Sequence, residues 1–206
     1  MKKYLSGNII AFICEKFSIL ITVLFCFFAG ISIGVFIETL LSTENKDSIQ
    51  LFLDTHLFFE QLPGNDLTHV FLESAAINLT LLLIIALAGL TIIGFPAALL
   101  VLIYKGATLG FSAALLIETL DFKGLIMVFF TLVPQNLILI PIFLAATMAS
   151  LSLAFSVLSN KPSNIKKSLT KHAGNYIAFF LLLSVFVLGG CLIESFICPF
   201  LQRLIG

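Results

Sequence analysis

Cysteine and histidine carry the most reactive side chains in this 206-residue sequence, and their spacing matches no familiar site. A zinc or redox site usually places such residues about two to four positions apart. No CxxC pair exists, and the histidines are distant from every cysteine. The residues are Cys14, Cys26, Cys191, Cys198, His56, His69 and His172. We therefore predict no metal ion and no cofactor, and we interpret the cysteines as small apolar residues in helices.

Ser112 is the strongest candidate for a nucleophile, because Gly110-Phe111-Ser112-Ala113 is similar to part of the serine motif of rhomboid proteases. That chemistry requires a histidine base inside the membrane to activate the hydroxyl. All three histidines fall in polar segments of the sequence. The metalloprotease motif HExxH and the phosphate-binding motif GxxxxGK[ST] are also absent from it. We therefore predict that the chain is not an enzyme.

A few polar residues lie within or beside long apolar blocks: Asn78, Thr80, Lys105, Gln135 and Asn136. A polar side chain surrounded by lipid must find a hydrogen-bond partner, so these residues are expected to face neighbouring helices. Interhelical hydrogen bonding is the simpler interpretation, and a substrate site is the alternative. A buried, water-lined cavity at Lys105, Gln135 and Asn136 would favour the substrate site and, with it, a small permease or transport-associated subunit.

The acidic residues argue against a carrier, because no carboxylate is predicted in the middle of a span. Glu38, Glu118 and Glu194 each lie near the end of an apolar block, and we predict that all three face the outer interface. A proton- or sodium-coupled carrier usually needs an acid buried inside the membrane. Transport is therefore the alternative to the function predicted below.

The composition predicts that lipid surrounds most of the chain. Apolar residues make up 60% of the sequence and charged residues only 11%, whereas soluble domains average about 25% charged residues. Basic and acidic residues balance to a formal net charge of zero, so charge gives no indication of nucleic-acid binding. The expected environment is the lipid bilayer of the cell membrane.

Five apolar blocks predict an all-α, polytopic membrane protein with about five transmembrane helices in one integral domain, residues 1–206. A crossing needs about 20 apolar residues. The expected spans are residues 17–37, 75–103, 107–120, 137–158 and 176–197. An outer loop is expected at residues 38–74, and a basic cytoplasmic loop at residues 159–175.

The lysines set the expected orientation, because lysine and arginine accumulate on the cytoplasmic side of membranes. With the N-terminus inside and the C-terminus outside, most basic residues lie in the cytoplasm. The inner ones are Lys2, Lys3, Lys16, Lys105, Lys161, Lys166, Lys167 and Lys171, and the outer ones are Lys46, Lys123 and Arg203. The opposite orientation would reverse this ratio.

Two blocks are too long for one straight crossing and each contains a break. Residues 75–103 would form a helix of roughly 43 Å, and Gly94-Phe95-Pro96 can end or kink it, because proline lacks a backbone donor. The cytoplasmic turn therefore lies either at Gly94–Pro96 or at Tyr104–Gly106. In the other block, Pro134-Gln135-Asn136 separates a short outer arm, re-entrant or interfacial, at residues 125–133 from the span at 137–158.

Two GxxxG pairs, Gly30 with Gly34 and Gly106 with Gly110, predict close helix packing. Small residues one turn apart allow two helix backbones to approach each other within a membrane. We expect this contact to form within one chain rather than between two copies.

The predicted outer loop contains an amphipathic segment at residues 49–60. Ile49, Phe52, Leu53 and Leu57 fall on one helical face of it. A helix lying on the outer leaflet is one interpretation. A docking surface for an extracellular partner is the other.

The middle of the sequence resembles the stage II sporulation protein M family. The resemblance is carried, in order, by Gly94-Phe95-Pro96, Lys105-Gly106 with Gly110-Phe111, Phe122-Lys123-Gly124, and Pro134-Gln135-Asn136-Leu137. It extends over roughly residues 75–206, and Pro134-Gln135-Asn136 after an apolar run is its most specific part. These residues, including Gly94, Pro96 and Asn136, are treated as a candidate structural motif.

The resemblance implies a non-enzymatic membrane scaffold in endospore formation. Its implied partners are two peptidoglycan-degrading proteins, stage II sporulation proteins D and P. Together they would thin the septal peptidoglycan and drive engulfment, which implies a location in the septal and engulfing mother-cell membrane. Relatives in organisms that form no spores mean that the domain alone does not establish the pathway.

Overall fold

The computed structural model describes residues 2–41, 64–91, 94–158 and 165–197. Within these ranges every regular element is helical, which confirms the predicted all-α class. The elements are α1 (Lys2–Thr39), α3 (Gly64–Leu90), α4 (Phe95–Met127), the π-helix η1 (Val128–Leu132), α5 (Val133–Leu158), α6 (Ile165–Leu192) and the π-helix η3 (Ile193–Ile197). Helices are the expected solution in lipid, because each satisfies its own backbone hydrogen bonds.

Four helical stretches of the described residues are long and apolar enough to cross a membrane, so the protein is a multi-pass membrane protein. They are Phe17–Thr39, Leu67–Leu90, Phe95–Phe155 and Gly174–Phe196. The third stretch is 61 residues long. A straight helix of that length would measure about 90 Å, three times the hydrocarbon core.

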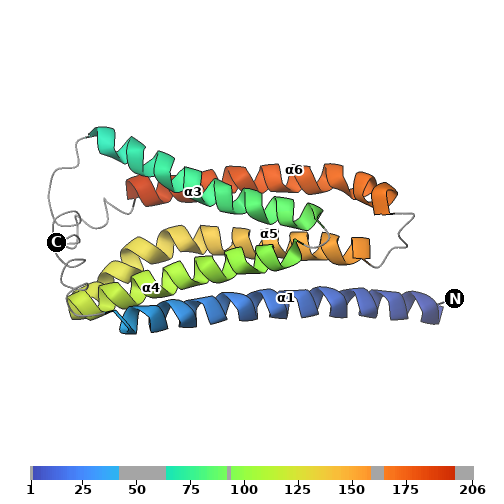
Figure 1. The fold of residues 1–206 in the computed structure, drawn as a ribbon, viewed down its shortest axis with the longest axis horizontal. Coiled ribbons are helices and arrows are strands. Elements are labelled where there is room, and N and C mark those ends of the chain that lie inside the picture. Colours follow the sequence, from blue (N-terminus) through green and yellow to red (C-terminus); the bar gives the residue numbers. More distant parts are fainter. Residues whose placement is uncertain (1, 42–63, 92–93, 159–164, 198–206) are drawn as a thin grey trace.

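This long stretch reverses direction where α4 leads into α5. Asp121 has φ 49° and ψ −124°, a backbone conformation outside the helical region, and it interrupts α4. The turn is tight, because a Cβ added at Gly124 would overlap the carbonyl group of Leu116. As a result, α4 and α5 lie side by side as antiparallel neighbours (Figure 1).

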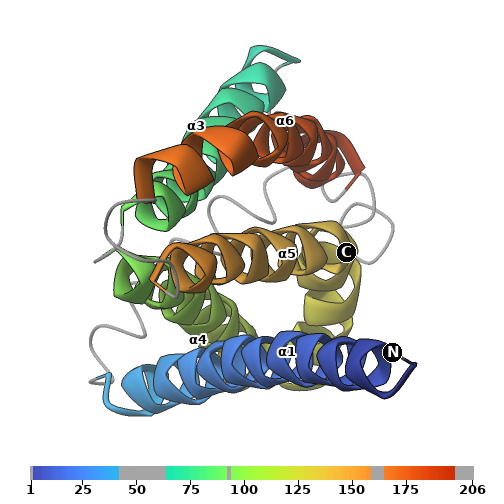
Figure 2. The ribbon, with the colours of Figure 1, turned by 90° about the vertical axis from the view of Figure 1, so that its right-hand side faces the viewer.

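The helices form a bundle in three layers. Helix α1 lies along α4 on one side, α5 occupies the middle, and α3 and α6 cover the other side (Figures 1 and 2). One end of the bundle gathers the end of α1, the start of α3, the reversal between α4 and α5, and η3 (Figure 1). We refer to it as the Glu38 end. Large apolar side chains such as Phe25, Phe122 and Leu137 are exposed on the outside, as expected in lipid.

The predicted span at residues 75–103 was wrong, because the chain breaks inside it. Helix α3 ends at Leu90 and α4 begins at Phe95, after Gly94 as the N-cap residue. The break therefore falls at the Gly94-Phe95-Pro96 motif, the first of the two predicted alternatives, with the turn directly before Phe95. Pro96 lies in the first turn of α4, where its missing N–H leaves no hydrogen bond unmade. Residues 96–103 consequently join the predicted span 107–120 in one helix, and Tyr104–Gly106 is continuous helix.

The predicted loop boundaries were also too wide. Residues 64–74 of the expected outer loop belong to α3, and residues 165–175 of the expected cytoplasmic loop belong to α6. Apolar periodicity alone misses such helix ends, because polar residues can extend a helix beyond the hydrocarbon region. The amphipathic segment with Ile49, Phe52, Leu53 and Leu57 lies outside the described residues.

Residues 125–133, predicted as a short outer arm, continue the helical path from α4 through η1 into α5. The π-helix ends at Leu132, directly before Val133 and Pro134. Pro134 supplies no backbone donor, so one helical hydrogen bond is missing here. The wider π-turn directly before it lets the chain continue into α5 as a helix. The expected spans at 137–158 and 176–197 lie within α5 and within α6 plus η3.

The two glycine pairs bring α1 and α4 into backbone contact. A Cβ added at Gly30 would overlap the carbonyl oxygen of Ile103, and one added at Gly106 would overlap that of Phe27. Gly34 and Gly110 lie equally close to the backbone of the opposite helix. The two GxxxG pairs therefore face each other within one chain.

Candidate functional site

Lys105 occupies an unusual position for a lysine, inside the bundle and part-way along α4. Its Nζ lies 5.4 Å from the centre of the Phe143 ring of α5, and Phe143 itself is only 1% exposed. A cation over an aromatic face gains up to about 2 kcal/mol where water is excluded. Charged residues at this depth are costly and usually mark a functional centre.

A hydrogen-bonded polar cluster connects α3 to the end of α6. The Ser74 hydroxyl donates to a carboxylate oxygen of Glu194. The Asn78 amide donates to the Ser74 carbonyl at 2.9 Å, and it lies 3.7 Å from the sulfur of Cys191. The Ser195 hydroxyl donates to the carbonyl of Cys191 at 2.8 Å. The Ser74–Glu194 bond and the Asn78–Cys191 contact join two segments that are distant in sequence, while the other two bonds are made within one segment.

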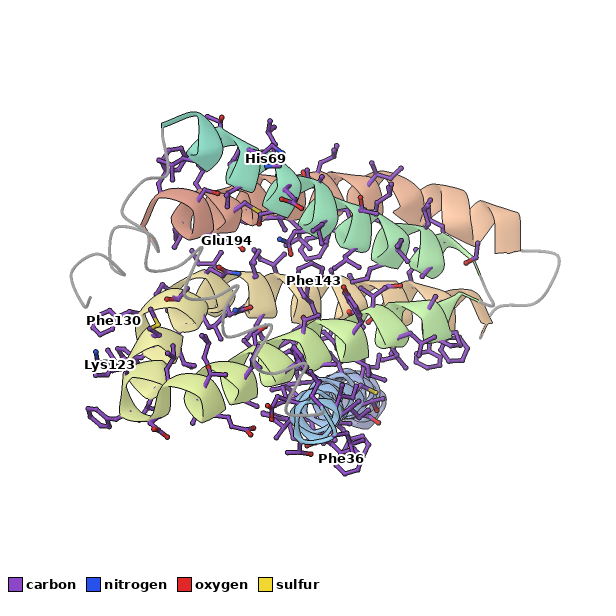
Figure 3. The ribbon with its side chains drawn as sticks, turned by 60° about the vertical axis from the view of Figure 1, so that its left-hand side comes forward. Phe36, His69, Lys123, Phe130, Phe143 and Glu194 are labelled. Carbon is purple, nitrogen blue, oxygen red and sulfur yellow. The ribbon has the colours of Figure 1, made fainter. Side chains whose placement is uncertain are left out.

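Glu194 lies at the Glu38 end of the bundle, together with Glu38, and it is partly buried there. It is only partly exposed and lies between the α3–α6 layer and α5, with Phe143 deeper in the bundle (Figure 3). Glu38 is likewise buried, at 1% exposure, whereas Glu118 is exposed. Helix α3 packs against this end of the α6–η3 segment, so the Glu194 carboxylate is partly covered.

Lys105 lies close enough to the Glu194 carboxylate for their opposite charges to attract each other. Attraction between opposite charges is strong in such surroundings, because the local dielectric constant is far below that of water. We call Lys105, Phe143, Ser74, Asn78, Cys191 and Glu194 the polar centre. It joins α3, α4, α5 and the α6–η3 segment.

Asn136 lies next to the polar centre, at the start of α5. Its amide donates to the Leu132 carbonyl at 2.8 Å, within the π-turn before Pro134. Gln135 does not line the cavity beside Lys105. That cavity measures about 10 Å³ and is lined by Phe27, Lys105, Asn136, Leu139, Ile140 and Phe143.

A volume of this size holds about one water molecule. The water-lined substrate cavity that would favour a permease is therefore not found at Lys105 among the described residues, and the permease alternative is not favoured. Within the same ranges, no three side chains of histidine, cysteine, aspartate or glutamate gather as a metal site.

Ser74, Cys191 and Glu194 were not predicted as partners of the polar residues Asn78 and Lys105. Ser74 and Asn78 are four positions apart, as are Cys191 and Ser195, so each pair lies on one helical face. This four-residue spacing could have indicated that each pair shares a helical face. The contact between the two faces could not be predicted, because it depends on how α3 and α6 pack.

One comparison with known proteins identifies a family. The family described as stage II sporulation protein M matches residues 11–199. No curated protein and no solved structure matches the chain.

Proposed function

The chain belongs to the stage II sporulation protein M family, and on that premise we propose that it is a non-enzymatic membrane scaffold in endospore formation. The observation that carries the proposal is the extent of the family match, residues 11–199, which includes all or most of every described helix. A bundle closed by backbone packing between α1 and α4 also suits a scaffold, because a rigid body can hold partners in a constant arrangement.

The partners we propose are peptidoglycan-degrading proteins of the stage II sporulation D and P types. In this proposal the chain assembles them at the septum and in the engulfing mother-cell membrane. The contact surface is the segment with Ile49, Phe52, Leu53 and Leu57, whose apolar residues fall on one helical face.

We further propose that the single domain crosses the membrane five times, with the N-terminus inside. The reversal between α4 and α5 supports this count, since it divides the longest apolar stretch into two antiparallel helices. The lysine distribution supports the orientation. The Glu38 end of the bundle would then face the cell exterior.

Cysteine labelling tests this topology. In a chain whose native cysteines are replaced by alanine, His69→Cys is expected to react with a membrane-impermeant maleimide in intact cells. His69 lies on α3 near the Glu38 end, and its side chain is 80% exposed. Lys167→Cys is expected to react only after permeabilisation. Labelling of Lys167→Cys in intact cells would show that the orientation is inverted.

Deletion of the gene in a sporulating host tests the function. Imaging of the septum is expected to show unthinned peptidoglycan and arrested engulfment, both restored by the intact gene. Normal engulfment in the deletion strain would contradict the scaffold role.

The partner surface has its own test. Phe52→Asp should abolish recovery of cell-wall hydrolases in a pull-down from sporulating cells, while the protein accumulates normally. Thr55→Asp, on another face of the same segment, is the matched control and should retain the hydrolases. Equal recovery with both variants would place the partner surface elsewhere.

A further inference from the structure

The small cavity beside Lys105 lies where α1, α4 and α5 meet. Four of its lining side chains are apolar and come from α1 and α5: Phe27, Leu139, Ile140 and Phe143. The other two are polar, the ammonium of Lys105 on α4 and the amide of Asn136 on α5. Cavities that stay dry in proteins are lined by apolar groups alone. A cavity between a cation and an amide is therefore suited to a polar occupant.

The Lys105 ammonium needs hydrogen-bond acceptors, because it carries three N–H donors. Within the described residues, no group accepts a hydrogen bond from it. Phe143 presents a ring face 5.4 Å from Nζ, and Glu194 acts on the ammonium through its charge. An ammonium removed from water without hydrogen bonds is strongly disfavoured. An acceptor inside the cavity would satisfy one of these donors.

Asn136 supplies the complementary group on the other side of the cavity. Its NH₂ group donates to the Leu132 carbonyl at 2.8 Å, within the π-turn before Pro134. This bond takes up the donor end of the amide, so the carbonyl oxygen is the atom available to the cavity. A carbonyl oxygen can only accept. The cavity therefore suits a ligand that accepts from Lys105 and donates to Asn136.

We propose that this cavity binds one water molecule, which accepts a hydrogen bond from Lys105 Nζ and donates one to the carbonyl oxygen of Asn136. The volume of about 10 Å³ holds one water and nothing larger. Two polar partners are the fewest that a buried water usually has. A chloride ion is larger and is repelled by the Asn136 oxygen, and a metal cation is repelled by the ammonium.

The water makes Asn136 a positioning residue for Lys105. A bridging water is enthalpically nearly as good as a direct hydrogen bond, so the lysine keeps part of its hydration inside the bundle. The π-turn holds the Asn136 amide, the amide holds the water, and the water joins the start of α5 to α4. This role is independent of the scaffold function proposed above, because it concerns only the interior of the chain.

A crystal structure of the full chain, at a resolution that shows ordered water, tests the proposal without any variant. We expect a water peak about 2.5–3.2 Å from both Lys105 Nζ and the Asn136 carbonyl oxygen. A well-ordered cavity without this peak would overturn the proposal. Crystals grown in bromide instead of chloride should show no anomalous signal there. A bromide peak in the cavity would identify the occupant as a halide and would also overturn the proposal.

Melting temperatures of purified variants in detergent test the bridge in solution. The double variant Lys105→Met, Asn136→Leu should lose about 2–4 °C less than the sum of the two single variants, because either change alone removes the bridge. Lys105→Met with Gln135→Leu is the matched control, since Gln135 carries the same amide but does not line the cavity. Its losses should add to within about 1 °C. Additive losses at Asn136, or equal departures from additivity at both positions, would contradict the bridge.

Discussion

Replacing Gly34 with leucine is expected to separate α1 from α4 and to destabilise the bundle by about 3 kcal/mol or more, near the upper limit measured for overpacked cores. A Cβ at this position would overlap the Ala107 carbonyl oxygen and lie 2.8 Å from the backbone nitrogen of Phe111. Backbone atoms cannot move aside as a flexible side chain can, so the two helices must separate. In a chain of this size the melting temperature should fall by about 6–12 °C.

The matched control is Gly189→Leu in α6. A Cβ added at Gly189 would meet nothing within 4 Å, so its leucine extends into open space. Thermal unfolding in detergent and the accumulated amount of protein provide the two measurements. Similar melting temperatures for both variants would show that the α1–α4 contact contributes little to stability.

Replacing Glu194 with glutamine is expected to destabilise the protein by about 1–3 kcal/mol. Glutamine can still accept the hydrogen bond from Ser74, but it leaves the Lys105 ammonium without the opposite charge to which it is coupled. The Lys105 ammonium inside the bundle then loses the attraction of that carboxylate. Adding Lys105→Met removes that remaining charge and should recover much of the lost stability.

A double-mutant cycle measures this coupling. The difference between the double variant and the sum of the two single variants should be about 1–3 kcal/mol. Glu73→Gln is the control, because that carboxylate is 66% exposed on the same helix as Ser74, and exposed pairs contribute little. Additivity to within about 0.5 kcal/mol would show that Lys105 and Glu194 act independently.

The polar centre meets an apolar groove of about 690 Å³ between α1, α4 and the η1–α5 segment at Asn136, which lines both this groove and the small cavity beside Lys105. Its amide is held on the Leu132 carbonyl by the π-turn. Pro134-Gln135-Asn136, the most specific part of the family resemblance, therefore marks the point where these two regions come together.

Helical class, lipid as the solvent and the family were all predictable from the sequence. Each depends on composition or on local order along the chain: long apolar blocks, scarce charge, and motifs such as Gly94-Phe95-Pro96 and Pro134-Gln135-Asn136. The glycine pairs also indicated close packing, because one-turn spacing is a property of a single helix.

Tertiary structure alone decided which faces meet. Glu194 looked terminal in sequence, yet α3 covers it and brings it to Ser74 and within electrostatic reach of Lys105. The reversal at Asp121 places α4 beside α5, and together with α1 they form a groove. This groove could not be predicted from any one apolar block of the sequence. Local sequence patterns determine where helices form, because the backbone hydrogen bonds of a helix are made within one segment. The pairing of polar groups inside the bundle depends on contacts between segments that are distant in the sequence, such as Ser74 with Glu194 at a separation of 120.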